Sequence, residues 1–315
     1  MSGNPGPPHG SHGPHDTVFR NTDLPALFHH TDALAIRRQR EAVSHTRRQL
    51  LLLVAGAVAA ALPVWKLGGT FQLGGALSVL AYAGVLVVGA RASRSRAKSH
   101  WQLNRSAAEY IKSMCWRYSV HGAPFDESAA DADALFVTRL EDGLRELTKV
   151  GWPDPRKSNP EVLAGGLITT PMRRLRERPF GPRKETYIRD RLIEQRNWYH
   201  RSAETSRRAT LVWSATIGIL TLFALTLSLL HTFSVAESLD VLGALSAAAA
   251  GCLAWSEIRR RRPLIAAHSL VEEDLAAMHS AMETSVTEAQ WPSAVYETER
   301  IVSPQHTDWL VRQRS

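Results

Sequence analysis

Residues 67–90 read LGGTFQLGGALSVLAYAGVLVVGA, and residues 209–236 read ATLVWSATIGILTLFALTLSLLHTFSVA. Neither stretch contains Asp, Glu, Lys or Arg. Each is longer than the roughly 20 apolar residues with which a helix crosses a hydrocarbon core of about 30 Å. A shorter apolar segment lies next to each of them, at residues 50–65 and 241–256. The sequence therefore predicts an all-α integral membrane protein with two transmembrane helical hairpins, extended by long cytoplasmic helices.

We expect the transmembrane helices at about residues 49–66, 67–90, 209–233 and 240–257. The alternative is that these segments are buried core helices of a soluble bundle. Soluble helices seldom continue beyond about 20 residues without a charge, which disfavours that alternative.

The formal net charge of +8 is concentrated beside these segments. Basic residues flank the same end of every predicted hairpin: Arg37, Arg38, Arg40, Arg47, Arg48, Arg91, Arg94, Arg96, Lys98, Arg201, Arg207, Arg208, Arg259, Arg260, Arg261 and Arg262. The turns at the other end hold only Lys66 in the first hairpin, and Glu237 and Asp240 in the second. The positive-inside rule then places both termini and the middle segment in the cytoplasm. The arginines are predicted to face a lipid bilayer with anionic headgroups, at about 1 kcal/mol each, and not nucleic acid.

The chain of 315 residues divides into four parts by composition. Residues 1–30 are rich in Gly, Pro and His, which predicts a disordered tail. Residues 31–150 form a first module, residues 151–183 a Pro- and Arg-rich linker, and residues 184–315 a second module that repeats the plan of the first.

Cytoplasmic helices are predicted on either side of the hairpins. A short amphipathic helix is expected over residues 131–150, with Phe136, Leu140, Leu144 and Leu147 on one face. Two further apolar seams have spacings of three and four, which is typical of helices that pack on a partner. Their residues are Trp101, Asn104, Ala108, Ile111, Cys115 and Tyr118, and then Ile188, Leu192, Gln195, Tyr199, Ser202 and Ser206.

Small residues recur at intervals of four in the predicted membrane helices. Gly243, Ala247 and Gly251 follow this pattern in the fourth helix, and Gly56 and Ala60 in the first. Such spacing lets helix backbones approach closely, so we interpret these residues as helix-packing positions.

A polar stripe follows one face of the third predicted membrane helix and includes Thr210, Ser214 and Thr221. Hydroxyl groups there could line a water-filled path. They could equally bond to the carbonyl four residues earlier and hold helices together. The second interpretation is favoured because no acidic or basic residue accompanies the stripe.

The chain contains no recognisable catalytic motif, so we predict neither catalytic residues nor an enzyme. Neither Cys115 nor Cys252 has another metal-ligating residue at a suitable spacing in the sequence, and the histidines are irregularly spaced. We therefore expect no metal site and no cofactor.

Two patches resemble a known family. Residues 107–125 read AAEYIKSMCWRYSVHGAPF and are similar to the segment after the hairpin in one subfamily of SLATT proteins, effectors with two transmembrane helices associated with SMODS nucleotidyltransferases and SLOG proteins. Residues 187–203 read YIRDRLIEQRNWYHRSA and are similar to the segment before the hairpin in another subfamily, as are residues 306–309 to its closing helix. The residues that carry the resemblance are Trp116, Pro124, Phe125, Tyr187, Arg191, Gln195, Trp198 and Tyr199.

The resemblance covers most of residues 31–314 and implies a bacterial inner-membrane effector of conflict systems. Such a protein is expected to form homo-oligomers and to permeabilise the membrane when a nucleotide second messenger or a nucleotidyltransferase-linked partner signals infection. A tandem of two modules departs from the single-hairpin plan of the family. The alternative functions are a non-enzymatic membrane scaffold or sensor that anchors a cytoplasmic helical bundle and, less favoured, an unrecognised membrane enzyme.

Overall fold

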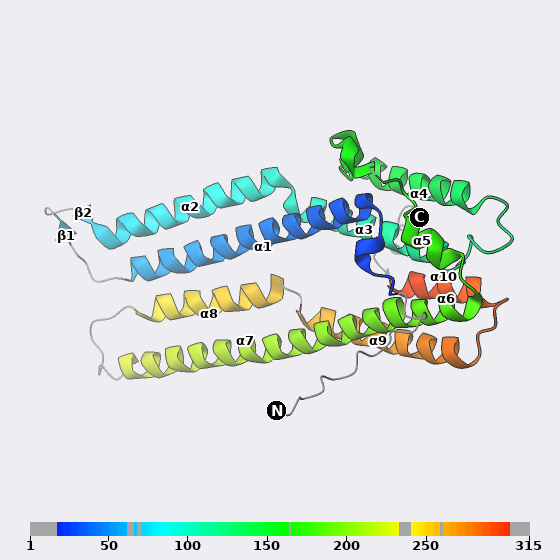
Figure 1. The fold of residues 1–315 in the computed structure, drawn as a ribbon. Coiled ribbons are helices and arrows are strands. Elements are labelled where there is room, and N and C mark those ends of the chain that lie inside the picture. The colour runs from blue at the N-terminus through cyan, green and yellow to red at the C-terminus, as the bar shows by residue number, and fades with distance from the viewer. Residues whose placement is uncertain are drawn as a thin grey trace, which may run out of the picture.

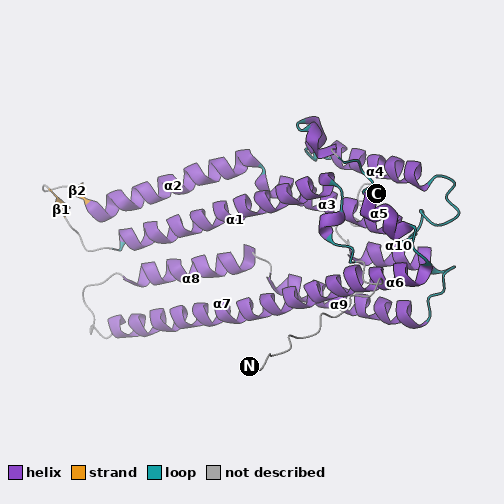
Figure 2. Cartoon of the chain, viewed as in Figure 1, coloured by secondary structure: helices purple, strands orange, loops and turns teal. Residues whose placement is uncertain are grey.

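The computed structural model describes residues 18–61, 66–67, 71–163, 165–232, 241–258 and 261–302. Almost all of the described chain is helical (Figures 1 and 2). Long helices lie side by side at one end of the molecule, and shorter helices gather at the other. Both halves of the chain contribute to both ends.

The first half begins with a short 3-10 helix, η1 (Asn21–Asp23), followed by the long helix α1 (Ala26–Ala60). Beyond it, β1 (Lys66–Leu67) and β2 (Phe71–Gln72) pair as antiparallel strands. Helix α2 (Leu73–Ser95) then returns alongside α1, and α3 (Ala97–Ser119) continues in the same direction. Arg96, between them, has a φ of 46°, in the left-handed region. The backbone therefore changes course between α2 and α3, five residues beyond the predicted end of this crossing at about residue 90.

Short helices connect the two halves. They are α4 (Ala132–Lys149), the 3-10 helices η2 (Pro155–Lys157) and η3 (Pro160–Leu163), α5 (Thr170–Arg176) and α6 (Phe180–Tyr187). The helix predicted over residues 131–150 is confirmed. The Asp131 carboxylate caps its first turn by accepting the N–H of Ala134, and all four predicted apolar positions are buried.

The second half starts with a π-helical turn, η4 (Ile188–Ile193), which leads directly into α7 (Glu194–Thr232). Helix α8 (Val241–Ile258) returns beside α7, and α9 (Arg261–Thr284) and α10 (Trp291–Val302) complete the described chain. The second half therefore repeats the order of long helix, return helix and terminal helices seen in the first.

We call the bundle of long helices the shaft, made of residues 50–61 of α1, α2, residues 209–232 of α7, and α8. Two helical stretches, Leu73–Ser119 and Phe180–Leu230, are long and apolar enough to cross a membrane. Their most apolar windows are only 6% and 0% buried. Of the crossings predicted at about residues 49–66 and 240–257, residues 49–60 lie in α1 and residues 241–257 in α8, whereas residues 62–65 and 240 lie outside the described chain. The helix predicted from residue 67 begins only at Leu73, because residues 66–67 and 71–72 pair as strands.

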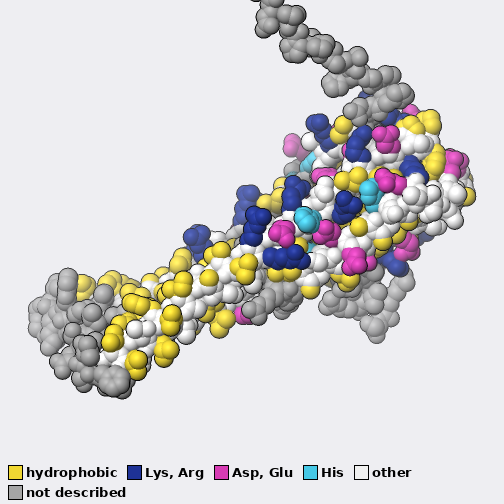
Figure 3. All heavy atoms as spheres, turned by 90° about the horizontal axis from the view of Figure 1, so that it is seen from below, with side chains coloured by type: hydrophobic (Ala, Val, Ile, Leu, Met, Phe, Trp, Pro, Cys, Tyr) yellow, Lys and Arg dark blue, Asp and Glu magenta, His cyan; other side chains and the backbone are white. Residues whose placement is uncertain are grey.

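We call the described residues 18–49, 96–163, 165–208 and 261–302 the head. The head contains most of the buried core. Figure 3 shows hydrophobic side chains along the shaft and Lys, Arg, Asp and Glu side chains gathered over the head. Ile111 and Cys115 of the predicted α3 seam are fully buried in this core. Asn104 of the same seam is buried too, and its polar groups are satisfied. It accepts the indole N–H of Trp152 (3.1 Å) and donates to the His100 carbonyl (2.8 Å).

The prediction of a disordered tail over residues 1–30 is wrong for residues 18–30. Phe19, Leu24 and Leu27 are buried in the head. The backbone N–H of Phe19 donates to the Asp190 carboxylate (2.9 Å), and the Thr169 hydroxyl donates to the Asp23 carbonyl (2.7 Å). Residues 18–30 are therefore folded and pack against the head.

The Pro- and Arg-rich segment at residues 151–183 was predicted to be a linker, but much of it is folded and packed. Trp152, Val162, Met172 and Leu175 from this segment are buried in the core. The prolines begin or precede short helices, where a missing N–H costs nothing.

Candidate functional site

Several of the residues that carry the family resemblance lie where the two halves of the chain meet in the head. Trp116 and Phe125 come from the first half, and Tyr187 from the second; all three are buried. The Tyr187 ring lies edge-on between Trp116 (centroids 5.7 Å apart) and Trp291 (5.6 Å). The structure therefore brings residues from both resemblance patches into one aromatic cluster.

Arg191 and Tyr199 lie in the same core, whereas two of the resemblance residues do not. Tyr199 is buried, and its hydroxyl donates to the Val302 carbonyl (3.1 Å). Trp198 is 42% exposed and stacks against Tyr199 and His268, while Gln195 is half-buried. Burial raises the pKa of Tyr199, so its hydroxyl stays a donor at neutral pH.

Arg191 lies in the π-helical turn η4 and forms a buried ion pair with Glu299 of α10. The Arg191 Nε and Nη2 atoms donate to the two Glu299 carboxylate oxygens at 2.9 and 2.7 Å, and each side chain is 1% exposed. The Tyr187 hydroxyl also donates to Glu299 (3.0 Å). Burial alone would lower the pKa of Arg191, but the carboxylate outweighs it and the pKa is raised.

The pKa of Lys112 on α3 is affected by the charges of the same ion pair. Burial lowers its pKa to about 8, and the positive charge of Arg191 contributes to the shift. A lysine with a pKa near 8 is partly deprotonated at mildly basic pH. The ion pair therefore influences a titratable group on a helix of the other half.

The loop after α3 fits tightly against α10. A Cβ atom added at Gly122 would lie 2.5 Å from Val295 Cγ1, so only glycine allows this approach. The N–H of Ala123 donates to the Pro292 carbonyl (2.9 Å), and the Trp291 indole donates to the Val120 carbonyl (2.7 Å). Pro124, which follows, is joined to Ala123 by a cis peptide bond and is half-buried.

Sequence reasoning missed Glu299 and Trp291 because it placed no helix at residues 291–302. The signal was available in Val295, Thr298 and Val302, which are buried on one face of α10 at spacings of three and four. Residues 306–309, used for the resemblance, lie outside the described chain.

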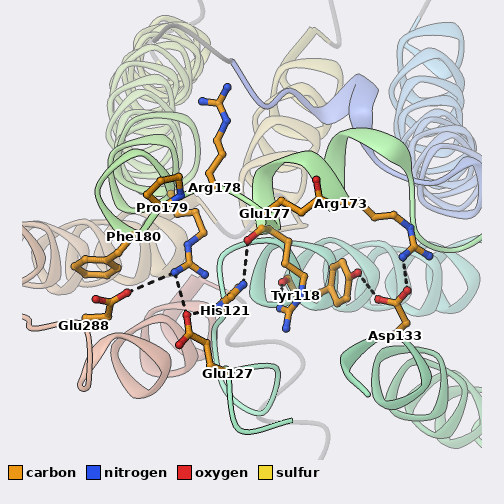
Figure 4. Close-up of a pocket in the computed structure, with 12 residues that line it drawn as sticks. Tyr118, His121, Glu127, Asp133, Arg173, Glu177, Arg178, Pro179, Phe180 and Glu288 are labelled. Atoms are coloured by element: carbon orange, nitrogen blue, oxygen red, sulfur yellow. Dashed lines mark hydrogen bonds and ion pairs between the residues drawn. The ribbon is translucent and has the colours of Figure 1, made fainter. Parts of the chain in front are cut away.

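A cavity of about 770 Å³ lies beside this junction. Its walls come from the end of α3, the start of α4, helices α5 and α6, and the connection between α9 and α10. The basic residues that line it are His121, Arg173, Arg176, Arg178 and Arg183. The acidic ones are Glu127, Asp133, Glu177 and Glu288. Figure 4 shows the side chains of Tyr118, His121 and Phe180 between these charged groups.

Several of these charges are already engaged. Asp133 accepts hydrogen bonds from Arg173 and from the Tyr118 hydroxyl (Figure 4). Arg176 Nη1 donates to the Tyr118 and Phe125 carbonyls at 2.7 and 2.8 Å, and its guanidinium group lies 4.9 Å from the centre of the Tyr118 ring. These contacts fix Arg176 against the cavity wall.

Arg183 is the least satisfied of the charged groups. Its side chain is 4% exposed, and its Nε and Nη1 atoms have no hydrogen-bond partner among the described residues. Nη2 lies 3.7 Å from a carboxylate oxygen of Glu127 and 3.7 Å from one of Glu288, which is beyond hydrogen-bond distance. Burial lowers the pKa of Arg183.

His121 borders Arg176 and Arg183 and is neutral at physiological pH. Burial, followed by the positive charges of these two arginines, lowers the pKa of His121 to about 4. Its Nε2 lies 3.0 Å from the Arg176 carbonyl and its Nδ1 lies 3.6 Å from Glu127. The backbone of His121 is left-handed, with φ 60°.

The predicted helix-packing residues lie within the shaft, in different environments. A Cβ on Gly251 would lie 2.9 Å from Val54 Cγ2, so α8 approaches α1 closely at this point. Gly56 is buried against α2, where a Cβ added at Gly56 would lie 3.1 Å from the Tyr82 ring. The other three positions vary in exposure: Ala247 is half-buried, and Ala60 and Gly243 are exposed.

The residues of the predicted polar stripe lie on α7. The hydroxyls of Thr210 and Thr221 donate to the carbonyls of Ser206 and Ile217, four residues earlier, both at 2.8 Å. Ser214 and Thr221 are exposed, and Thr210 is half-buried. Within this single chain the two threonine hydroxyls therefore bond to their own helix.

Among the residues that the structure describes, no group of three or more His, Cys, Asp or Glu side chains could hold a metal ion. The thiol of Cys115 is buried, and burial raises its pKa far above the ordinary value, so it is a poor nucleophile. The groups suited to ligand chemistry are therefore the charged side chains of the cavity.

Comparison with protein families gives two matches in tandem. The family described as SMODS and SLOG-associating 2TM effector domain 3 matches residues 25–184. The family described as SMODS and SLOG-associating 2TM effector domain 1 matches residues 187–309. No curated protein and no solved structure matches the chain.

Proposed function

The chain belongs to the SLATT family of two-transmembrane effector domains and carries two different SLATT modules in tandem, and on this basis we propose that it is a bacterial effector of the inner membrane. In this proposal the shaft inserts as two transmembrane hairpins, several copies associate, and the assembly permeabilises the membrane in response to a nucleotide-based signal of infection.

The exposed apolar surface of the shaft is the observation that carries the proposal. Leu86 of α2 is 74% exposed and Leu211 of α7 is 72% exposed. Many other apolar side chains on the same helices are also exposed. An exposed apolar surface of this extent needs a covering, and a lipid bilayer matches the length of the helices.

The charges at the junction between shaft and head support one orientation. Arg47, Arg48, Arg91, Arg207 and Arg208 are exposed there. Basic residues at this position favour the side of the membrane with anionic headgroups, which supports a cytoplasmic head. A homo-oligomer, a nucleotide second messenger and a nucleotidyltransferase-linked partner belong to the same proposal.

A membrane scaffold or sensor is the second candidate function. It is favoured by the threonine hydroxyls of α7, because groups already bonded to their own helix offer less to a water-filled path. A pore in an oligomer would instead require these or other polar groups to face a shared axis.

The effector function is tested by expressing the full chain in bacteria together with the nucleotidyltransferase of the same conflict system. We expect inner-membrane depolarisation, read with a voltage-sensitive dye, and slowed growth after infection. Deleting residues 210–255 should abolish both. The variant Leu222→Arg should also abolish them, because arginine near the bilayer centre costs about 2.5–3.5 kcal/mol and Leu222 is 64% exposed on the shaft.

The matched control is Val137→Arg, which adds the same charge at a 39% exposed apolar site on α4 of the head and should leave depolarisation intact. An unrelated four-crossing protein at equal expression controls for membrane crowding. A normal membrane potential in infected cells that contain the enzyme would exclude the pore and leave the scaffold.

A further inference from the structure

The cavity beside the junction holds a buried positive charge whose partners among the described residues are two long contacts with exposed carboxylates. Arg183 is 4% exposed, and two of its three guanidinium nitrogens have no hydrogen-bond partner among the described residues. A buried charge without hydrogen bonds is costly, because it has lost its hydration. Arg183 therefore has free donors with which to bind an anion in the cavity.

We propose that this cavity binds the phosphate group of a small soluble molecule, with Arg183 as the principal anchor. A guanidinium group offers neighbouring N–H donors in a rigid fork that matches two phosphate oxygens. The unpartnered Nε and Nη1 atoms of Arg183 are two donors of this kind. Arg176, held in place by the Tyr118 and Phe125 carbonyls, adds a second positive charge to the lining of the cavity.

His121 can act as a third contact. Its Nδ1 atom is buried without a hydrogen bond. Nε2 lies 3.0 Å from the Arg176 carbonyl and must donate to it, so Nδ1 of the neutral ring carries no proton. Nδ1 can donate to a phosphate oxygen only if the ring takes up a proton when the anion arrives.

The carboxylates around the cavity compete with an anion but do not close it. Asp133 is already bonded to Arg173 and Tyr118. The side chains of Glu127 and Glu288 are 76% and 62% exposed, and each contacts Arg183 only at 3.7 Å. Both can turn into solvent at little cost, which leaves the guanidinium group free for a phosphate.

The size and place of the cavity fit a small soluble ligand. Its volume of about 770 Å³ lies within the range of roughly 300–1,000 Å³ that is typical of ligand pockets. Figure 1 places α5 and α6 at the end of the molecule opposite to β1 and β2, beyond the ends of α2 and α8 where the shaft meets the head. A lipid headgroup is therefore a less suitable source of the phosphate than a molecule from solution.

Binding here would alter the contact between the two halves. Arg183 lies on α6, in the first matched region, and Glu288 precedes α10, in the second. A phosphate that takes the place of Glu288 at Arg183 would break a contact across the junction. The role of the cavity as the input of the effector rests on the proposed function, whereas binding itself does not.

The test uses inorganic pyrophosphate and the full chain in detergent, with affinity measured by calorimetry at fixed ionic strength. Wild-type protein should bind pyrophosphate, and Arg183→Gln should weaken binding at least tenfold. Glu288→Gln removes a competing carboxylate from an exposed site and should tighten binding. The matched control is Arg174→Gln, an exposed arginine of α5 outside the cavity, which should bind as wild type does.

Absence of binding to wild type, or equal weakening by Arg174→Gln, would overturn the proposal. If Arg183→Gln does not fold, Glu288→Gln decides alone, and unchanged or weaker binding by it contradicts the proposal. Vesicles with and without phosphatidylglycerol form a further arm, and Arg183-dependent binding to anionic vesicles alone would assign the phosphate to a lipid. Because no membrane leak is measured, these results do not depend on whether the protein forms a pore.

Discussion

Arg191 carries a full positive charge inside the head, with 1% of its side chain exposed. Its two bonds to Glu299 and the Tyr187 hydroxyl on the same carboxylate make a compact polar group within an aromatic cluster. A buried ion pair gives little net stability, because desolvation of both charges opposes their attraction. We therefore expect the pair to act mainly on the specificity with which η4 pairs with α10.

Removing one partner should therefore cost more than removing both. We expect Arg191→Met and Glu299→Met each to lower the free energy of unfolding by about 3–5 kcal/mol, because each leaves an unpaired buried charge. The double variant should cost clearly less than the sum of the two. Chemical denaturation in detergent measures this cycle.

The matched control is the exposed pair Arg145–Asp142, whose side chains are 67% and 54% exposed. Breaking it with Arg145→Met should change the free energy of unfolding by less than about 1 kcal/mol. Additive effects of the two buried substitutions would show that Arg191 and Glu299 do not act as a pair.

Individual site residues could be predicted from the sequence only in part. Arg191 and Tyr187 were singled out by resemblance, and both lie in the buried junction. The burial of Arg183 and Glu299 could not be predicted even with their helices known, because a charge on an amphipathic helix is expected to face solvent until its tertiary partner is known. Gly122 could not be interpreted without Val295, which contacts it from α10.

At the scale of elements, one close approach in the shaft joins the two halves of the chain. Gly251 of α8 lies against Val54 of α1, which come from different modules. The sequence indicated that Gly251 allows a helix to approach but could not say which helix. The partner was not evident because small-residue spacing specifies a face and not its neighbour.

The substitution Gly251→Ile should separate α8 from α1. A Cβ alone would lie 2.9 Å from Val54 Cγ2, and the branched side chain adds further bulk. Overpacking of this kind costs about 1–3 kcal/mol, so the midpoint of thermal unfolding in detergent should fall. The variant is apolar and should still insert in the membrane.

Gly218→Ile is the control for this experiment, because a Cβ at Gly218 has no atom within 4 Å among the described residues. It places the same side chain on another apolar helix and should not lower the melting temperature. Equal melting temperatures for Gly251→Ile and wild type would mean that this face of α8 points to lipid.

Helix positions were predicted best where periodicity and length were strong. Helix α4 matches its predicted range because its apolar residues, its N-cap and its flanking loop all agree. The sequence does not predict the start of α1 or the helices α5 and α6, because the proline and glycine content of these segments disfavours regular structure. Burial of Phe19 and Met172 in the head outweighs that composition.

On the scale of the whole molecule, the proposed orientation can be tested by labelling with an impermeant maleimide. In a Cys252→Ala background, Ser128→Cys lies on the exposed surface of the head, and Ser238→Cys lies in the predicted outer turn of the second hairpin. The native Cys115 is fully buried and should not react. We expect labelling of Ser238→Cys in intact cells, and of Ser128→Cys only after permeabilisation. Labelling of Ser128→Cys in intact cells would reverse the topology.

The helical stretch Phe180–Leu230 has a mechanical consequence. Its 51 residues span about 75 Å at 1.5 Å per residue, and Arg183 lies close to one end. Such a rod acts as a lever: a tilt of about 5° at the cavity displaces the far end by about 6 Å, roughly half a helix diameter. In the first half, the corresponding long helix α1 also runs without a break from the head into the shaft, whereas the left-handed Arg96 separates the return helix α2 from α3. A tilt produced at the cavity would therefore reach the far end of the shaft along the helical stretch that carries Arg183.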